Sequence, residues 1–128
     1  KIIQIIESDR FKAYELDERR RFHAAAALAG HDIDYWHTRF SSSGLLSSKQ
    51  SELDRHCAAV VLGIRMHRVA TEALNKELKK RFKSPTVMEG AAWALQHLEC
   101  DREQRTQQLY DLFFYGRLTM NETEPSDG

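Results

Sequence analysis

The stretch HCAAVVLGI, residues 56–64, restricts the possible folds of this chain more than any other part of the sequence. It lies inside an otherwise polar run that extends over residues 53–82. On a helix, an apolar block of this length leaves almost no side that faces water. The block is also far shorter than the roughly 20 residues that a membrane-spanning helix requires. We therefore expect residues 57–64 to be surrounded by other helices.

Apolar residues continue the same pattern on both sides of this block. One seam recurs at spacings of 3 and 4 residues, the heptad pattern of packed helices, although two of its positions are polar. A second, adjacent seam makes the apolar face too wide for a single partner helix. We therefore predict one long central helix over about residues 47–82, in contact with at least two neighbours. The first seam is Leu53, Cys57, Val60, Ile64, His67, Thr71, Leu74 and Leu78, and the second is Ala59, Leu62, Met66, Val69 and Ala73.

Capping residues divide the first third of the chain into two further helices. Ser8 or Asp9 can cap the first of them, and Gly30 can end it. Alternatively, this helix continues through Gly30 at a cost of about 1 kcal/mol relative to Ala. Asp32 is a favourable N-cap for the second helix, and the run SSSG at residues 41–44 predicts the loop that follows it.

Capping patterns also mark the two helices that follow the central one. A Ser-Pro pair places a good N-cap directly before the residue type that is preferred at the first helical position. A capping box pairs the N-cap side chain with the side chain three residues later. The patterns are Ser84 before Pro85, with a competing box of Thr86 and Glu89, and then Asp101 with Gln104 after a break near Cys100.

The composition supports a helical fold. Only 6 of the 128 residues are Gly and 2 are Pro, and good helix formers are abundant. We predict an all-α helical bundle of four or five helices around the central one, although the opening segment, residues 1–7, fits a strand as well as a helix. We expect one domain over residues 1–120 and a disordered acidic tail over residues 121–128.

The charges of the chain balance overall but not locally. Nineteen Lys and Arg residues match nineteen Asp and Glu residues, so no net field attracts nucleic acid or an acidic membrane surface. Residues 65–83 carry a net charge of +5, whereas residues 84–128 carry −5. The simplest interpretation is that the two segments complement each other within the chain, and the alternative is a charged partner.

Four lysines at the end of the predicted central helix are candidates for contact with nucleic acid. They can share one helical face and would form a cationic stripe able to lie along phosphates. The competing interpretation is a solvated helix end, because lysines in the last turns of a helix also complement its dipole without any ligand. The four residues are Lys76, Lys79, Lys80 and Lys83.

Consecutive aromatic residues in the last helix indicate a contact with another chain or segment. Phe113, Phe114 and Tyr115 follow one another, so they cannot all face one core. Aromatic residues are enriched in the cores of protein interfaces, although packing within the monomer explains them equally well. With apolar residues of the second seam they make up the predicted partner interface, which is Leu62, Met66, Val69, Phe113, Phe114 and Tyr115.

The stretch HDIDYWH, residues 31–37, has the composition of a metal site but not its spacing. Ligands on one helix need to be three or four residues apart; Asp34 with His37 meets this condition, whereas His31 and His37 are six apart and face nearly opposite sides. The chain has no Glu-x-x-His pair, no HExxH motif and no Gly-rich phosphate loop. His56 and Cys57 are adjacent, and neighbouring helical residues point about 100° apart, so they do not form a nucleophile–base pair. We expect no catalytic residue, no metal ligand and no cofactor.

The two cysteines and the first residues of the chain indicate the cellular compartment of the protein. Cys57 and Cys100 have neither metal-binding nor redox spacing, and nothing resembles the cysteine framework of a secreted protein, although a disulfide between them stays open. The chain does not begin with a charged and then apolar export signal. We expect a cytoplasmic protein with no membrane association, in which Cys57 is a small core residue.

These observations favour a non-catalytic function. We predict a helical protein–protein interaction or oligomerisation module, such as an adaptor or assembly factor. Its partner would be another protein chain or a second copy of itself in a homodimer. One alternative is a small nucleic-acid-binding regulator that uses the basic end of the central helix. A second is a metal-dependent helical enzyme.

Overall fold

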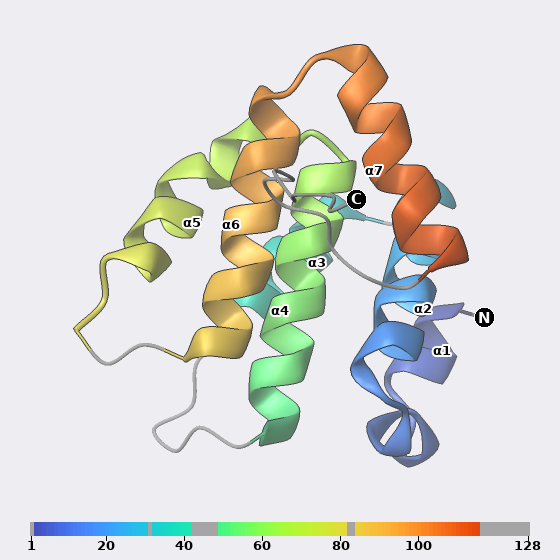
Figure 1. The fold of residues 1–128 in the computed structure, drawn as a ribbon. Helices are drawn as coiled ribbons and strands as arrows, with labels where there is room; N and C mark the ends of the chain where they lie inside the picture. The colour runs from blue at the N-terminus through green and yellow to red at the C-terminus, as the bar shows by residue number, and fades with distance from the viewer. Residues whose placement is uncertain (1, 31, 42–48, 82–83, 116–128) are drawn as a thin grey trace, which may run out of the picture.

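A computed structural model describes residues 2–30, 32–41, 49–81 and 84–115. These residues form seven α-helices, two short 3-10 helices and no strand, which confirms the predicted all-α class (Figure 1). The predicted tail at residues 121–128 lies outside the described residues, as does the expected loop beyond Ser41. The elements are α1 (Ile2–Ile6), η1 (Asp9–Ala13), α2 (Leu16–Leu28), α3 (Ile33–Ser41), α4 (Lys49–Ile64), η2 (Arg68–Ala70), α5 (Thr71–Leu78), α6 (Pro85–Glu99) and α7 (Arg102–Phe114).

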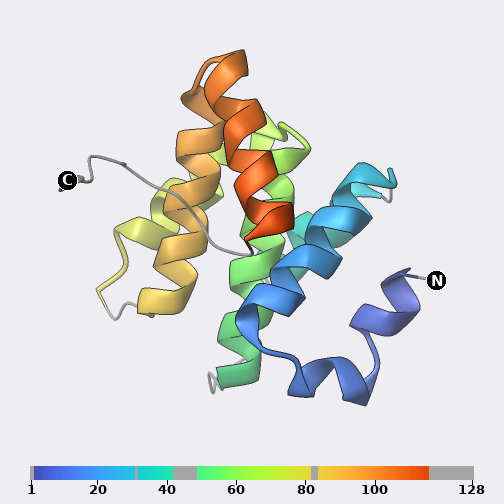
Figure 2. The same cartoon turned by 45° about the vertical axis from the view of Figure 1, so that its right-hand side comes forward.

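Helix α4 lies at the centre of the fold. It packs against α6 along most of its length and against α2 and α3 on its other sides. Helix α5 packs on α6, and α7 turns back after α6 to contact α2 (Figure 2). Every residue from His56 to Ile64 is buried. The apolar block is therefore covered on all sides by helices of this chain, as the sequence predicts.

The prediction of one continuous helix over residues 47–82 is wrong. Helix α4 ends at Ile64, and Met66 adopts a left-handed backbone conformation with φ of 55°. The N–H of Met66 donates to the carbonyl of Gly63 (2.9 Å), and the N–H of His67 donates to the carbonyl of Leu62 (3.0 Å). This pair of hydrogen bonds is the Schellman motif, which satisfies the last carbonyls of a helix. The first seam is therefore divided between α4 and α5. This division and the additional helix α1 explain why the described residues contain more helices than the four or five expected.

Two glycines allow α4 and α6 to lie unusually close together. A Cβ atom on Gly90 of α6 would lie 2.7 Å from the carbonyl oxygen and 3.0 Å from the Cα of His56. A Cβ atom on Gly63 of α4 would lie 2.9 Å from the Cα of Ala94. Real Cβ atoms do not approach backbone atoms to such distances, so the present spacing of the two helices depends on both glycines.

The capping signals of the N-terminal third are confirmed in part. Ser8 caps only η1, where its hydroxyl accepts from the N–H of Phe11, and α2 begins later. At the start of α2, the side chain of Glu18 accepts from the N–H of Glu15 (3.2 Å). Gly30 follows the end of α2 with a positive φ of 82°, as a helix-ending glycine should. Asp32 accepts from the N–H of the second residue of α3 (3.0 Å).

The predicted starts of the last two helices are both confirmed. The hydroxyl of Ser84 accepts from the backbone N–H of the third residue of α6, and Pro85 is the first residue of that helix. Asp101 accepts from the N–H of Gln104 (2.9 Å), and the side chain of Gln104 accepts in return from the N–H of Asp101 (3.3 Å). Because α6 begins at Pro85, the competing start at Thr86 is not used.

Candidate functional site

Two adjacent arginines of α2 are buried against α4 and α6, and the sequence analysis missed them. The fully buried guanidinium of Arg19 forms an ion pair with Asp54 on α4. The Nε of Arg20 donates to His56 Nε2 (3.0 Å), and its Nη2 lies 3.5 Å from a carboxylate oxygen of Glu89 on α6. Neighbouring helical residues point about 100° apart, so the two arginines join α2 to different partners. These charges are used inside the chain to hold three helices together.

Three histidines are buried and neutral. Burial, with a smaller contribution from nearby arginines, lowers the pKa of His23 from 6.5 to about 3 and that of His56 to about 4. Burial also lowers the pKa of His97, although the hydrogen bond that its Nδ1 donates to the side-chain oxygen of Gln108 (2.6 Å) raises it. His56 accepts from Arg20 at Nε2, so its Nδ1 carries the proton that is donated to the carbonyl of Thr86 (2.7 Å). Each ring is a structural link between helices.

Cys57 is not a reactive thiol. Burial raises its pKa to about 12, which keeps the sulfur protonated. Both Cys57 and Cys100 are free cysteines, so no disulfide joins them. The side chain of His56 is occupied by Arg20 and Thr86 rather than by the neighbouring sulfur. The arrangement therefore provides no nucleophile activated by a base.

The six residues of the predicted partner interface do not form one surface. Leu62 is fully buried in this chain, whereas Met66 and Phe113 are half-buried against its core. Val69 is 76% exposed, but it lies in η2 before α5 and not on α7. Only the residues at the end of α7 remain together as an exposed group.

That exposed group includes a residue that the sequence analysis did not select. Tyr110 lies one helical turn before Phe114, with their ring centroids 4.5 Å apart, and the ring of Tyr115 lies 6.1 Å from that of Tyr110. The exposed fractions are 48% for Tyr110, 66% for Phe114 and 56% for Tyr115. The spacing of four residues between Tyr110 and Phe114 was the available signal. We refer to these three residues as the aromatic end of α7.

The predicted lysines lie at the end of α5 and the turn that follows it. Lys76, Lys79 and Lys80 are all exposed, and Lys83 lies outside the described residues. Lys80 forms an ion pair with Glu77 (3.1 Å). No ion pair involves Lys76 within the described part of the chain.

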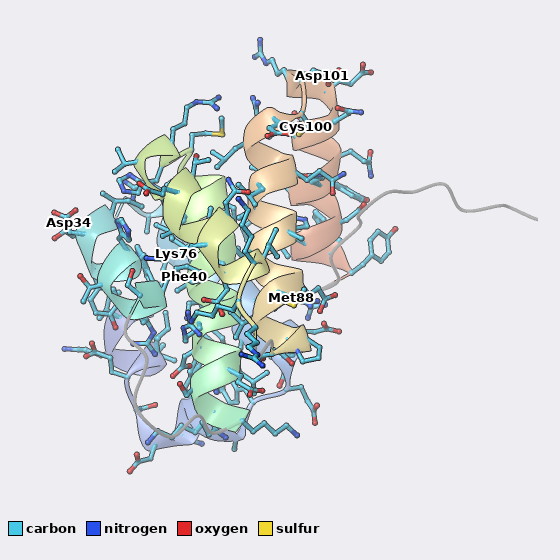
Figure 3. The ribbon with its side chains drawn as sticks, turned by 90° about the vertical axis from the view of Figure 1, so that its left-hand side faces the viewer. Asp34, Phe40, Lys76, Met88, Cys100 and Asp101 are labelled. Carbon is cyan, nitrogen blue, oxygen red and sulfur yellow. The ribbon has the colours of Figure 1, made fainter. Side chains whose placement is uncertain are left out.

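Lys76 and Lys80 also line a cavity between α3, α4 and α5, which we refer to as the basic cavity. Its volume is about 250 Å³. Figure 3 shows two of its residues, Phe40 of α3 and Lys76 of α5, side by side at the gap between these helices. The residues that line it are Phe40, Ser41, Arg55, Ala73, Lys76, Glu77 and Lys80.

The histidines and aspartates near α3 do not assemble a metal site in the described residues. Asp34 and His37 are on α3, and the ring of His37 packs edge-on against His67 with centroids 5.4 Å apart. Burial and the neighbouring His37 lower the pKa of His67. Across residues 2–30, 32–41, 49–81 and 84–115, no three His, Cys, Asp or Glu side chains are grouped as metal ligands. His31, the remaining candidate, lies outside these ranges.

None of the helices in the described residues combines the length and the apolar character that a bilayer span requires. The chain matches no known family model, and neither curated proteins nor solved structures give a match.

Proposed function

We propose that this chain is a non-catalytic helical interaction module and that the aromatic end of α7 is its contact surface. The observation that carries the proposal is the exposure of three aromatic side chains in mutual contact at one end of a helix. Tyr and Phe are enriched in interface cores, where they bury a large area at a low cost in side-chain entropy. The inner face of the same helix already contributes Leu112 to the core of this chain.

The use of the buried polar side chains favours a binding function over a catalytic one. Three buried histidines and two buried arginines hold the helices of this chain together. In contrast, more than half of the surface of Phe114 and of Tyr115 faces solvent. A partner that covered this group would remove apolar surface from water, at about 25 cal/mol for each Å² buried.

Self-association is the first test of this proposal. We expect sedimentation of the purified chain to reveal a dimer at tens of micromolar, and we expect Phe114→Ser to weaken it at least tenfold. Leu28→Ser is the matched control, because Leu28 is a similarly exposed apolar residue (61%) on α2. Equal weakening by both variants would contradict a specific role for α7.

A strictly monomeric chain would eliminate the homodimer, and a photo-crosslinking residue then tests for a different partner. We expect a crosslink from position 114 to one defined protein in the source cells, and none from position 28. A monomer that gives no crosslink from position 114 would refute the proposal.

Nucleic-acid binding at the end of α5 is the second candidate. The observation that favours it is the exposure of Lys76, Lys79 and Lys80 close together, with Lys76 outside any ion pair of the described chain. Phosphate contacts of this kind predict binding that weakens steeply as salt increases. Reversing the charge of Lys76, Lys80 and Lys83 should abolish it. If the unmodified chain shifts neither DNA nor RNA at low salt, this candidate is refuted.

A further inference from the structure

The basic cavity is built from three helices that are far apart in the sequence. Phe40 and Ser41 come from the end of α3, Arg55 from α4, Ala73, Lys76 and Glu77 from α5, and Lys80 from the turn that follows α5. Phe40 is buried, and its ring lies under the guanidinium of Arg55 at 5.1 Å. Ala73 adds a second apolar side chain to the lining. One part of the cavity is thus apolar, while the rest carries charge.

The charged part is held in place from inside the protein. Arg55 donates from Nε to the carbonyl of Phe40 (2.8 Å) and from its two terminal nitrogens to the carboxylate of Glu77 (2.7 and 3.4 Å). Burial raises the pKa of Glu77, but hydrogen bonds from Arg55 and Lys80 outweigh that effect and lower it overall. Glu77 is therefore ionised and shared between two cations.

The balance of charge in the cavity is positive. Arg55, Lys76 and Lys80 face a single carboxylate, that of Glu77, so the lining carries a net charge of +2. Lys76 lies on α5 and Lys80 in the turn that follows it, and both side chains line the cavity. Arg55 uses three of its five N–H donors in the hydrogen bonds described above, so donors remain on it and on both ammonium groups.

We propose that the basic cavity binds a phosphate group, either as inorganic phosphate or as the monoester of a small molecule. Converging Arg and Lys side chains recognise phosphate by charge-assisted hydrogen bonds. A volume of about 250 Å³ is at the small end of the range for ligand pockets, which suits a small ligand rather than a polymer. Ala73, which is only partly buried, provides an apolar surface in the lining for the remainder of a monoester.

The test is a titration of the 15N-labelled chain with inorganic phosphate, with chloride at equal ionic strength as the reference. We expect saturable shifts of the backbone amides around the cavity with phosphate only. Lys76→Gln and Lys80→Gln should each weaken binding about tenfold, as expected for one charged hydrogen bond. Lys79→Gln is the matched control, because Lys79 is an exposed lysine of the same segment that does not line the cavity, and it should change the affinity less than twofold.

Glu77→Gln gives a result in the opposite direction, because removal of the competing carboxylate should tighten phosphate binding severalfold. The surface lysine variants keep the test decisive if this buried variant fails to fold. No saturable shift with phosphate would overturn the proposal, as would equal weakening by Lys79→Gln.

A short single-stranded oligonucleotide and a small phosphomonoester separate the possible sources of the phosphate. Tighter binding of the oligonucleotide, with an equal effect of Lys79→Gln, would overturn the proposal in favour of a nucleic-acid surface. Tighter binding of the monoester than of inorganic phosphate would support a small-molecule ligand. Phe114→Ser should leave phosphate binding unchanged, so this inference and the proposed interaction surface can fail independently.

Discussion

Acid should unfold this protein through its buried histidines before its carboxylates are protonated. His23 and His56 have no exposed surface, and burial lowers their pKa values from 6.5 to about 3 and about 4. The Nδ1 of His23 lies 2.8 Å from the carbonyl of Arg19, and its Nε2 has no hydrogen-bond partner within the described residues. A proton added there would be a buried and unpaired charge.

The sign of the effect follows from where each state binds protons. Below pH 6.5 the unfolded chain protonates both rings, whereas the folded protein does not until the pH reaches 3 to 4. Stability is therefore present above pH 6.5 and is lost as the pH falls toward 4. At pH 5 each ring lowers the free energy of unfolding by about 2 kcal/mol, so the two together lower it by about 4 kcal/mol. This loss is large, because the total free energy of unfolding of a typical domain is about 5–15 kcal/mol.

Urea denaturation at pH 7, 6 and 5, followed by circular dichroism, measures this loss directly. The lowered pKa of Glu77 costs stability only as the pH falls through its ordinary value of 4.5 and below, so it adds little at pH 5. In His56→Gln the amide can still accept from Arg20 and donate to Thr86. Between pH 7 and pH 5 we expect this variant to lose about 2 kcal/mol less of its unfolding free energy than the original protein does. An unfolding free energy that is equal or higher at pH 5 in the original protein would refute the reasoning.

Three further predictions concern single sites. Gly90→Ala should lower the unfolding free energy by about 1–2 kcal/mol, because the added Cβ meets the backbone of His56. This overpacking outweighs the gain in helix propensity of about 1 kcal/mol. An increased unfolding free energy of the variant in urea denaturation would contradict this prediction. Asp101→Ala should cost about 1 kcal/mol through loss of the cap of α7, and an unchanged urea midpoint would show that this cap is not needed. Cys57 should not react with a thiol reagent at pH 8 until the protein unfolds, whereas the partly buried Cys100 should react faster. Equal reaction rates of the two cysteines would contradict the burial of Cys57.

Local signals were sufficient to predict several helix boundaries of this chain. The caps at Asp32, Ser84 and Asp101 and the positive φ of Gly30 depend on residues within one turn of each other. The end of α4 was missed for a physical reason. The residue in the left-handed conformation of a Schellman motif is usually Gly or Asn, whereas in this chain it is Met66.

The candidate sites were less predictable because they depend on contacts between distant segments. Arg19 and Arg20 resemble surface residues in the sequence, and only their partners on α4, about 35 residues later, explain their burial. The lysines of α5 were predicted as an exposed stripe, but their position beside Arg55 and Phe40 follows from the folding of α5 alongside α3. No periodicity in the sequence contains that information.

The turn at Met66 determines which charges this protein can bring together. If α4 and α5 formed one straight helix, Arg55 and Glu77 would be separated by about 33 Å along its axis, since each residue adds about 1.5 Å. In the folded chain their side chains are 2.7 Å apart. The ion pair between Arg55 and Glu77 therefore depends on the turn at Met66. Any condition that straightened residues 65–70 would break this ion pair and open the basic cavity in the same step.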